Sequence, residues 1–225
     1  MKILNTGDVT YGNSHADMIN KTIGTSYDGW QRSSVDLAQF GADGVIAWFI
    51  FMDGSEHGYE SGWRWKNFLS DNGDVIREYN VRPSKTAVIM KRDEEGYRPF
   101  RLCFRLDPYE IGSRHCCKFM GAFVLDSFIK EDLTAIKYIK VSDSFNLGSK
   151  GESGNYIDGK DIFLKKGGRL LKPLSELGLS DRVYRLLKSG GISFAWELLS
   201  LGMETSGEIA DEIRQKLYEV FRETR

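Results

Sequence analysis

The sequence predicts an α+β protein, and two observations lead to this fold class. Six segments between residues 45 and 141 have the length and the β-branched or aromatic content of strands. After Pro173 the pattern changes to the spacing of amphipathic helices. Because the strand segments are joined by short connections, we expect an N-terminal antiparallel sheet or small barrel with flanking helices, followed by a small all-α domain.

The strand segments differ in how many of their faces should be buried. Residues 45–52 form an apolar run that ends at Asp53-Gly54, which is typical of a buried strand and places Trp48 in the core. Residues 100–106 alternate cleanly, so we expect one face of this strand to meet solvent. The other strand segments are residues 75–81, 86–91, 116–125 and 135–141.

Short helices should precede the sheet. Ser14 is a good N-cap for a helix through Lys21, and Gly24 is placed to end it. A second short helical segment is expected over residues 33–40, closed by Gly41.

Composition and charge narrow the class of protein. The hydrophobic fraction of 41% is enough for a folded core, and the net charge of −1 means that any nucleic-acid contact must come from a local basic patch. The longest apolar run, residues 45–52, is far too short to span a membrane, and no secretory signal is seen. Three cysteines, two of them adjacent, do not make a disulfide framework, so we expect a cytoplasmic protein with no cofactor.

The chain divides into three parts. We expect a mixed α+β domain over residues 1–145, a linker or mobile loop rich in Gly, Ser and Lys over residues 146–169, and a helical domain over residues 170–225. In the helical part, Ser180 should cap a first helix through Lys188, and Ser193 a second over residues 194–199. A third helix is expected over residues 206–221, with Ile209, Ile213, Leu217 and Val220 on one stripe.

Residues 170–222 also resemble a known family. The entry Leu177-Gly178-Leu179-Ser180 followed by Arg182, and then Leu187-Lys188 with Gly190-Gly191-Ile192, is similar to the C-terminal domain of the bacterial RNA polymerase alpha subunit. The resemblance implies a helix-hairpin-helix that contacts the DNA backbone in or beside the minor groove. By this resemblance the DNA-binding residues are Arg182, Arg185, Lys188, Gly190 and Gly191.

One departure from that family leaves the role of the helical part open. The family's second glycine-rich hairpin is shortened here, and residues 202–208 contain no lysine. The part from Arg169 to Arg225 is also neutral, with nine basic and nine acidic residues. Docking onto another protein is therefore an alternative to DNA contact.

Aromatic residues gather near a glycine-rich loop in the N-terminal part. Trp63 and Trp65 alternate with Arg64 and Lys66. Aromatic faces with neighbouring cations suit base stacking or a pocket for a flipped base. The alternative for any of these tryptophans is simple burial in the core.

The same region carries the weak candidates for catalysis. Asp53, Glu56, His57 and Glu60 lie in one loop, and a histidine with three carboxylates can hold a hard metal or act as acid and base. A metal-dependent nuclease or nucleotide-modifying enzyme of a phage or defence system, which would also use Glu78, is thus an alternative function. Cys116 and Cys117 point to opposite faces of a strand, so no zinc site is expected.

Residues 97–102 and 117–123 are similar to the paired strands of PUA-like barrels, a class that includes domains reading modified bases in DNA. Together the observations favour a non-enzymatic nucleic-acid-binding protein. DNA is the expected partner, and RNA or a protein partner is the alternative. No membrane partner is expected.

Overall fold

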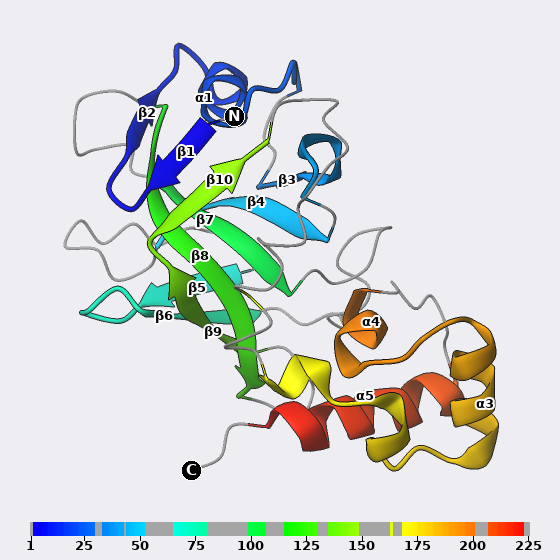
Figure 1. Ribbon diagram of the computed structural model, residues 1–225. Coiled ribbons are helices and arrows are strands. Elements are labelled where there is room, and N and C mark those ends of the chain that lie inside the picture. Colours follow the sequence, from blue (N-terminus) through cyan, green and yellow to red (C-terminus); the bar gives the residue numbers. More distant parts are fainter. Residues whose placement is uncertain are drawn as a thin grey trace.

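The fold is described from a computed structural model (Figure 1). The structure describes residues 2–29, 33–42, 44–52, 65–80, 99–106, 115–129, 135–148, 163, 168–200 and 207–222. A curved sheet occupies the upper part of Figure 1, and the C-terminal helices lie below it.

Eight strands of the described chain form one mixed sheet. Along the sheet their order is β3 (Ser34–Asp36), β4 (Val45–Ile50), β7 (Phe100–Leu106), β8 (Cys116–Phe128), β9 (Ala135–Ser142), β6 (Val75–Asn80) and β5 (Trp65–Leu69), while β2 (Val9–Tyr11) pairs with the start of β8. The expectation of an antiparallel sheet was wrong at one place, because β4 and β7 run parallel. Their carboxyl ends therefore reach the same edge of the sheet.

The sheet curls into a barrel. Strands lie about 4.8 Å apart, so β7 and β6, three places apart in the order, would be about 14 Å apart if the sheet were flat. Instead Arg101 of β7 and Glu78 of β6 approach to 3.5 Å. The side chain of Asn67 on β5 also donates to the carbonyl oxygen of Phe51, just after β4, at 3.2 Å. This contact brings β5, at one border of the sheet, next to the end of β4, which is second from the other border.

Strand β8 provides the bend. Its register with β7 shifts between Cys103 and Phe104, which leaves an extra residue on β8 and forms a bulge. Gly121 beside the bulge has φ of +120°, and an added Cβ would lie 2.8 Å from the backbone oxygen of Ser142. Bulges increase the twist and bend of a strand, so this one lets β8 curve around the barrel.

Two elements cover the outer face of the barrel beside β8. They are α1 (His15–Ile23) and a two-stranded sheet of β1 (Lys2–Asn5) with β10 (Ser144–Leu147). The predicted caps of α1 are confirmed, since the side chain of Ser14 accepts from the Asp17 N–H and Gly24 adopts the left-handed conformation. The predicted helix over residues 33–40 is partly wrong. Its first half is β3, paired with β4, and only Ala38–Phe40 is a short 3-10 helix.

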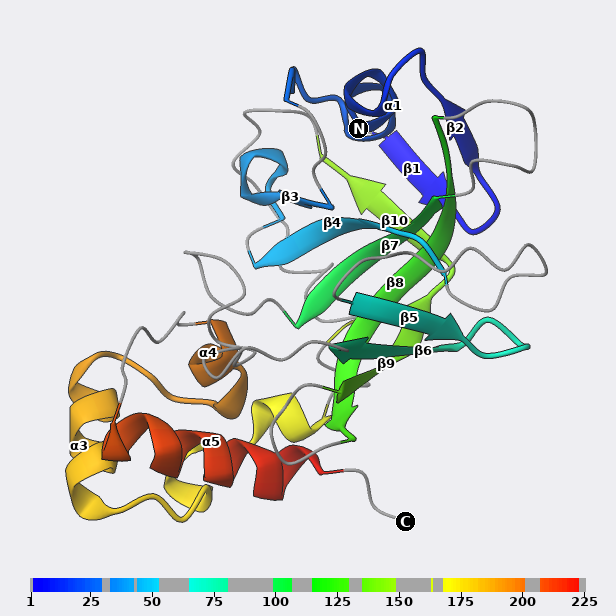
Figure 2. The ribbon, with the colours of Figure 1, turned by 180° about the vertical axis from the view of Figure 1, so that it is seen from behind.

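The C-terminal part contains α3 (Asp181–Ser189), α4 (Ala195–Ser200) and α5 (Glu208–Phe221), with short 3-10 turns at Gly168–Leu171 and Leu174–Glu176. Seen from behind, these helices pack below the barrel (Figure 2). Ring contacts join the two parts: Phe100 of β7 lies 5.9 Å from Trp196 of α4, and Phe128 of β8 lies 5.6 Å from Phe221 of α5. One apolar core therefore runs from the barrel into the helices.

Two described residues of the expected linker, residues 146–169, belong to this core. Leu147 is part of β10, and Phe163 is fully buried with its ring 5.2 Å from that of Phe100. Residues 149–162 and 164–167 lie outside the described residues, so the linker stays a prediction.

Candidate nucleic-acid interface

The interior of the barrel holds a charged side chain between two aromatic rings. Arg101 of β7 is only 2% exposed, and its guanidinium carbon lies 4.2 Å from the ring centre of Trp48 and 4.5 Å from that of Tyr138. Trp48 comes from β4 and Tyr138 from β9, so the cation joins opposite walls of the barrel. Such cation–π contacts are worth about 2 kcal/mol when they are shielded from water.

Glu78 supplies the counter-charge. This carboxylate on β6 is fully buried, lies 3.5 Å from the Arg101 guanidinium, and accepts a hydrogen bond of 3.3 Å from the Tyr138 hydroxyl. A buried ion pair is retained only when its partners are held in place, because each charge loses its hydration. We call Trp48, Glu78, Arg101 and Tyr138 the interior cluster.

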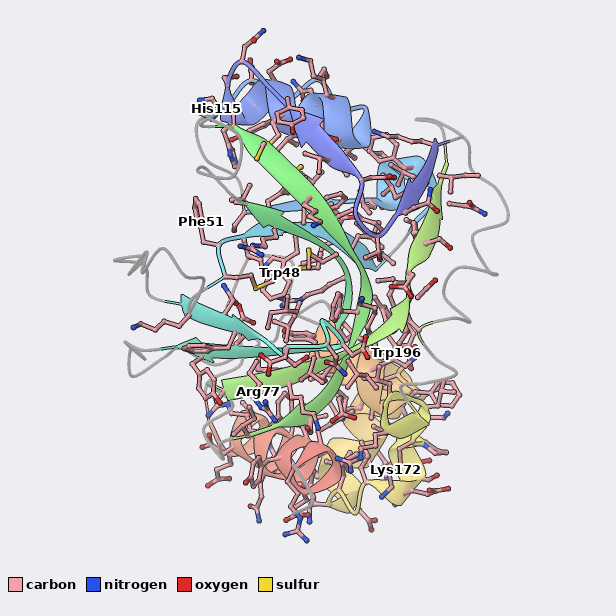
Figure 3. All side chains as sticks on the ribbon, turned by 90° about the vertical axis from the view of Figure 1, so that its left-hand side faces the viewer. Trp48, Phe51, Arg77, His115, Lys172 and Trp196 are labelled. Carbon is pink, nitrogen blue, oxygen red and sulfur yellow. The ribbon has the colours of Figure 1, made fainter. Side chains whose placement is uncertain are left out.

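Burial along β7 decreases toward its carboxyl end, which lies at the same edge of the sheet as the carboxyl end of β4. On β7, the residues from Phe100 to Phe104 are buried, whereas Arg105 and Leu106 are half-buried. Figure 3 shows Trp48 among the strands and Phe51, just after β4, at the outer edge of the molecule. We call this end of the barrel the mouth.

A second polar surface lies on α3. Arg182, Arg185 and Lys188 are exposed, while Val183 and Leu187 of the same helix face the core. Three cations thus project from one helix into solvent, where phosphate oxygens could reach them.

The backbone groups of the hairpin after α3 are already used. The N–H groups of Gly190 and Gly191 donate to the carbonyl oxygens of Leu186 and Lys188, at 3.1 and 3.0 Å. Gly191 has φ of +84°, which explains why glycine stands at this turn. These two N–H groups therefore satisfy carbonyl oxygens at the C-terminal end of α3.

Carboxylates of the protein also cap both helix starts. Glu212 of α5 accepts from the backbone N–H and the hydroxyl of Ser180 at the N-cap of α3. Glu197 accepts from the N–H groups of Ser193 and Phe194, both at 2.7 Å, ahead of α4. Because a helix N-terminus attracts an anion, these carboxylates occupy the places that a DNA phosphate would take.

The comparison with protein families decides the identity of the N-terminal part. Residues 1–147 match the model of the SRA family, the SET and RING associated domain. The chain belongs to the SRA family. This is a PUA-like DNA-binding fold, so the predicted likeness to PUA-like barrels is confirmed, and the match supports DNA as the partner.

Two solved structures are similar to the SRA protein described here. The 5-hydroxymethylcytosine-specific restriction enzyme AbaSI is 18% identical, with a TM-score of 0.48 over 65% of this chain and 43% of that chain. The DNA recognition domain of the cytosine modification-dependent restriction endonuclease LpnPI is 15% identical, with a TM-score of 0.36 over 92% of this chain and 94% of that one. The search of curated proteins found no match.

The SRA match ends at residue 147 and gives no support to the resemblance of residues 170–222 to the RNA polymerase alpha C-terminal domain. The described helices agree with the predicted order of three, with α3 capped by Ser180 as expected. Their identification as a helix-hairpin-helix that binds DNA stays a prediction.

Several sequence candidates of the SRA part lie outside the described residues. These are Asp53, Glu56, His57, Glu60 and Trp63. Trp65 begins β5, where its backbone pairs with Asn80, two residues before the Asn67 that closes the barrel. Trp48 is buried, as predicted.

One other candidate is placed in the core. Glu78, considered for catalysis, is fully buried and contacts Arg101 and Tyr138. The expectation of a solvated face on residues 100–106 was wrong, because Arg101 and Cys103 point into the barrel. Sequence reasoning missed the interior cluster. Its one signal was the charged Arg101 within a strand that is mostly apolar.

The cysteines are buried and free, as expected. Burial raises the pKa of the Cys117 thiol to about 11, and a hydrogen bond with Thr22 offsets part of this effect. Burial also raises the pKa of Cys103. Within the described ranges, no group of three His, Cys, Asp or Glu side chains is placed to hold a metal ion. No helix among them is long and apolar enough to cross a membrane.

Proposed function

We propose that this protein recognises a modified base in DNA with its SRA barrel and holds the DNA backbone with α3. The match of residues 1–147 to the SRA family is the observation that carries the proposal. The resemblance of the strands to PUA-like barrels that read modified bases supports the choice of ligand. The base recognised is a cytosine carrying a 5-substituent, turned out of the stack so that the barrel can reach it.

The interior cluster supports this function by making the barrel rigid. Arg101 connects Trp48, Glu78 and Tyr138, which come from three different strands. A recognition pocket must hold its walls in place to discriminate between bases that differ by one small group. Trp63 and Trp65 are the residues we propose to stack on the base, because aromatic faces hold a base that has left the duplex.

Base recognition is tested by fluorescence anisotropy with the full chain. The probes are duplexes of one sequence that differ at a single cytosine, which is unmodified, 5-methylated or 5-hydroxymethylated. We expect one modified duplex to bind about tenfold more tightly, which corresponds to about 1.4 kcal/mol. Trp63→Ala should remove this preference. Trp48 is not substituted in this test, because it is part of the core. Equal affinity for all three duplexes would disprove base recognition while leaving DNA binding intact.

The role of α3 rests on its exposed side chains, since the hairpin N–H groups are used within the protein. Figures 1 and 2 place α3 on the side of the molecule away from the end of β4. The contacts at α3 therefore involve a different stretch of DNA from the base held at the mouth. A duplex of about three helical turns should be used, so that both stretches are present.

The change Arg182→Ala with Arg185→Ala tests this contact. We expect weaker binding to every duplex, and a slope of log affinity against log salt that is smaller by about two, because two phosphate contacts are lost. Lys21→Ala on α1, at the other end of the molecule, is the matched control. Unchanged binding in the double variant would rule out α3 as a DNA contact, and a partner that survives nuclease treatment in a pulldown would then favour protein docking.

A further inference from the structure

Four strands place one residue each in a single line across the mouth. Val9 of β2 pairs with Lys118 of β8, Lys118 pairs with Arg105 of β7, and Arg105 pairs with Ile50 of β4. Side chains at paired positions share a face of the sheet. We call these four residues the mouth row.

The mouth row belongs to the inner face of the barrel. Arg105 follows Arg101 by four residues on β7, and side chains of a strand return to the same face every second residue. The bulge in this region is on β8, so the alternation along β7 is not interrupted. Arg101 points inward between Trp48 and Tyr138, and therefore Arg105 points to the same side.

Exposure changes at this row. Arg101 is buried, whereas Arg105 and Lys118 are half-buried, and Val9 and Tyr11 beside them are 39% and 44% exposed. Two cations at the boundary between the interior and the solvent are accessible to a ligand but are partly shielded from water. Electrostatic contacts at such a boundary are stronger than those on an open surface.

Arg105 and Lys118 occupy directly paired positions on β7 and β8, so one anion can contact both side chains at once. A guanidinium offers a planar fork to phosphate oxygens and an ammonium offers a point charge, so Arg105 and Lys118 together suit one phosphodiester.

We propose that Arg105 and Lys118 bind one backbone phosphate of the DNA next to the recognised base. The inference rests on the proposed DNA-binding function. It adds the site that holds the backbone at the mouth, separately from α3.

The test uses the full chain with Arg105→Gln and Lys118→Gln, each titrated against the modified and unmodified duplexes at several salt concentrations. We expect each variant to bind all duplexes roughly threefold to tenfold more weakly, with the salt slope reduced by about one. Lys137→Gln is the matched control. Lys137 is also a partly exposed strand cation, but it lies on β9 and pairs with Asp126.

A second measurement assigns the contact to a phosphate. Duplexes with one neutral methylphosphonate at each position near the modified base are titrated with the wild type and with Lys118→Gln. At one position, the neutral linkage should weaken the wild type but not weaken Lys118→Gln further. Thermal melting of each variant reports whether it is folded, and Arg105→Met, which also removes the charge, replaces any Arg105→Gln that is not.

The outcomes separate the two proposals. Salt-dependent binding by the wild type with unchanged affinity in both folded variants would overturn the mouth site and leave the proposed function in place. Additive losses from Lys118→Gln and every methylphosphonate would also overturn it. A wild type that binds no duplex at low salt would overturn the proposed function itself.

Discussion

The interior cluster and the α3 surface use the same side chain for opposite purposes. Arg101 is buried between Trp48 and Tyr138 and neutralised by Glu78, whereas Arg182 and Arg185 project into solvent. Arg101 follows Phe100 and Arg185 follows Tyr184, so the preceding residue does not distinguish a buried arginine from an exposed one. The difference comes from neighbours on distant strands. An arginine in a barrel strand meets three strands at once, while one on a surface helix meets only its own helix.

The largest effect should follow from breaking the buried pair. We expect Arg101→Met to lower the free energy of unfolding by about 3–5 kcal/mol, because Glu78 then stays buried without its counter-charge. Chemical denaturation followed by tryptophan fluorescence measures this. Arg185→Met on α3 is the control and should change stability by less than about 0.5 kcal/mol. If both changes cost the same, the contrast between the two arginines is wrong.

The next effect concerns the contact between the barrel and the helices. Phe221→Ala should destabilise the protein by about 3 kcal/mol or more, because this fully buried ring packs on Phe128 of the barrel. We expect the barrel and the helices to unfold in a single transition, and the midpoint of that transition should be lower in the variant. Far-ultraviolet circular dichroism and tryptophan fluorescence should therefore give the same midpoint. A shift seen by only one of these probes would contradict a shared core.

A smaller effect is expected at the start of α4. Glu197→Ala removes the acceptor of two backbone N–H groups and should cost about 1 kcal/mol. Glu197→Gln retains an acceptor oxygen and should lose less. Thermal melting of the two variants compares them directly. Equal losses would show that charge, and not the hydrogen bonds, stabilises this helix start.

The smallest expected effect concerns the rate at which the buried cysteine thiols react with a thiol reagent. Because the pKa of Cys117 is raised to about 11, this thiol stays protonated at pH 8 and should react with a thiol reagent much more slowly than free cysteine. Cys103 and Cys116 are buried as well and should behave in the same way. Adding denaturant should make all three thiols react. Fast labelling of the folded protein would show that the interior opens often.

The sequence predicted the bounds and caps of helices and strands better than it predicted which side chains meet in the folded protein. The bounds of β7 and the caps of α1 and α3 agree with the prediction, because strand periodicity and capping depend on residues close together in the chain. The burial of Arg101 could not be predicted. It depends on Glu78 and Tyr138, which reach it only because the sheet curls, and this curvature is produced by a bulge on another strand.

The candidate site also contains residues that the sequence identified and residues that it did not. The cations of α3 were identified from their helix and are exposed as expected. The N–H groups of Gly190 and Gly191 donate within α3, because a glycine turn can satisfy its own helix as well as a ligand, and a DNA contact by these two residues stays a prediction. Arg105 and Lys118 were not singled out at all. They are 13 positions apart in the chain, and only the pairing of β7 with β8 brings them together.

The ring contacts between the barrel and the helices determine how much of the chain must be kept if the SRA barrel is moved into another protein. The family match stops at residue 147, which invites a cut there. Such a cut would remove Trp196 and Phe221 and leave the rings of Phe100 and Phe128 facing water. Exposed aromatic patches of this kind promote aggregation. A transplant that keeps residues 1–222 retains the cover, so the portable unit is longer than the segment that family similarity marks.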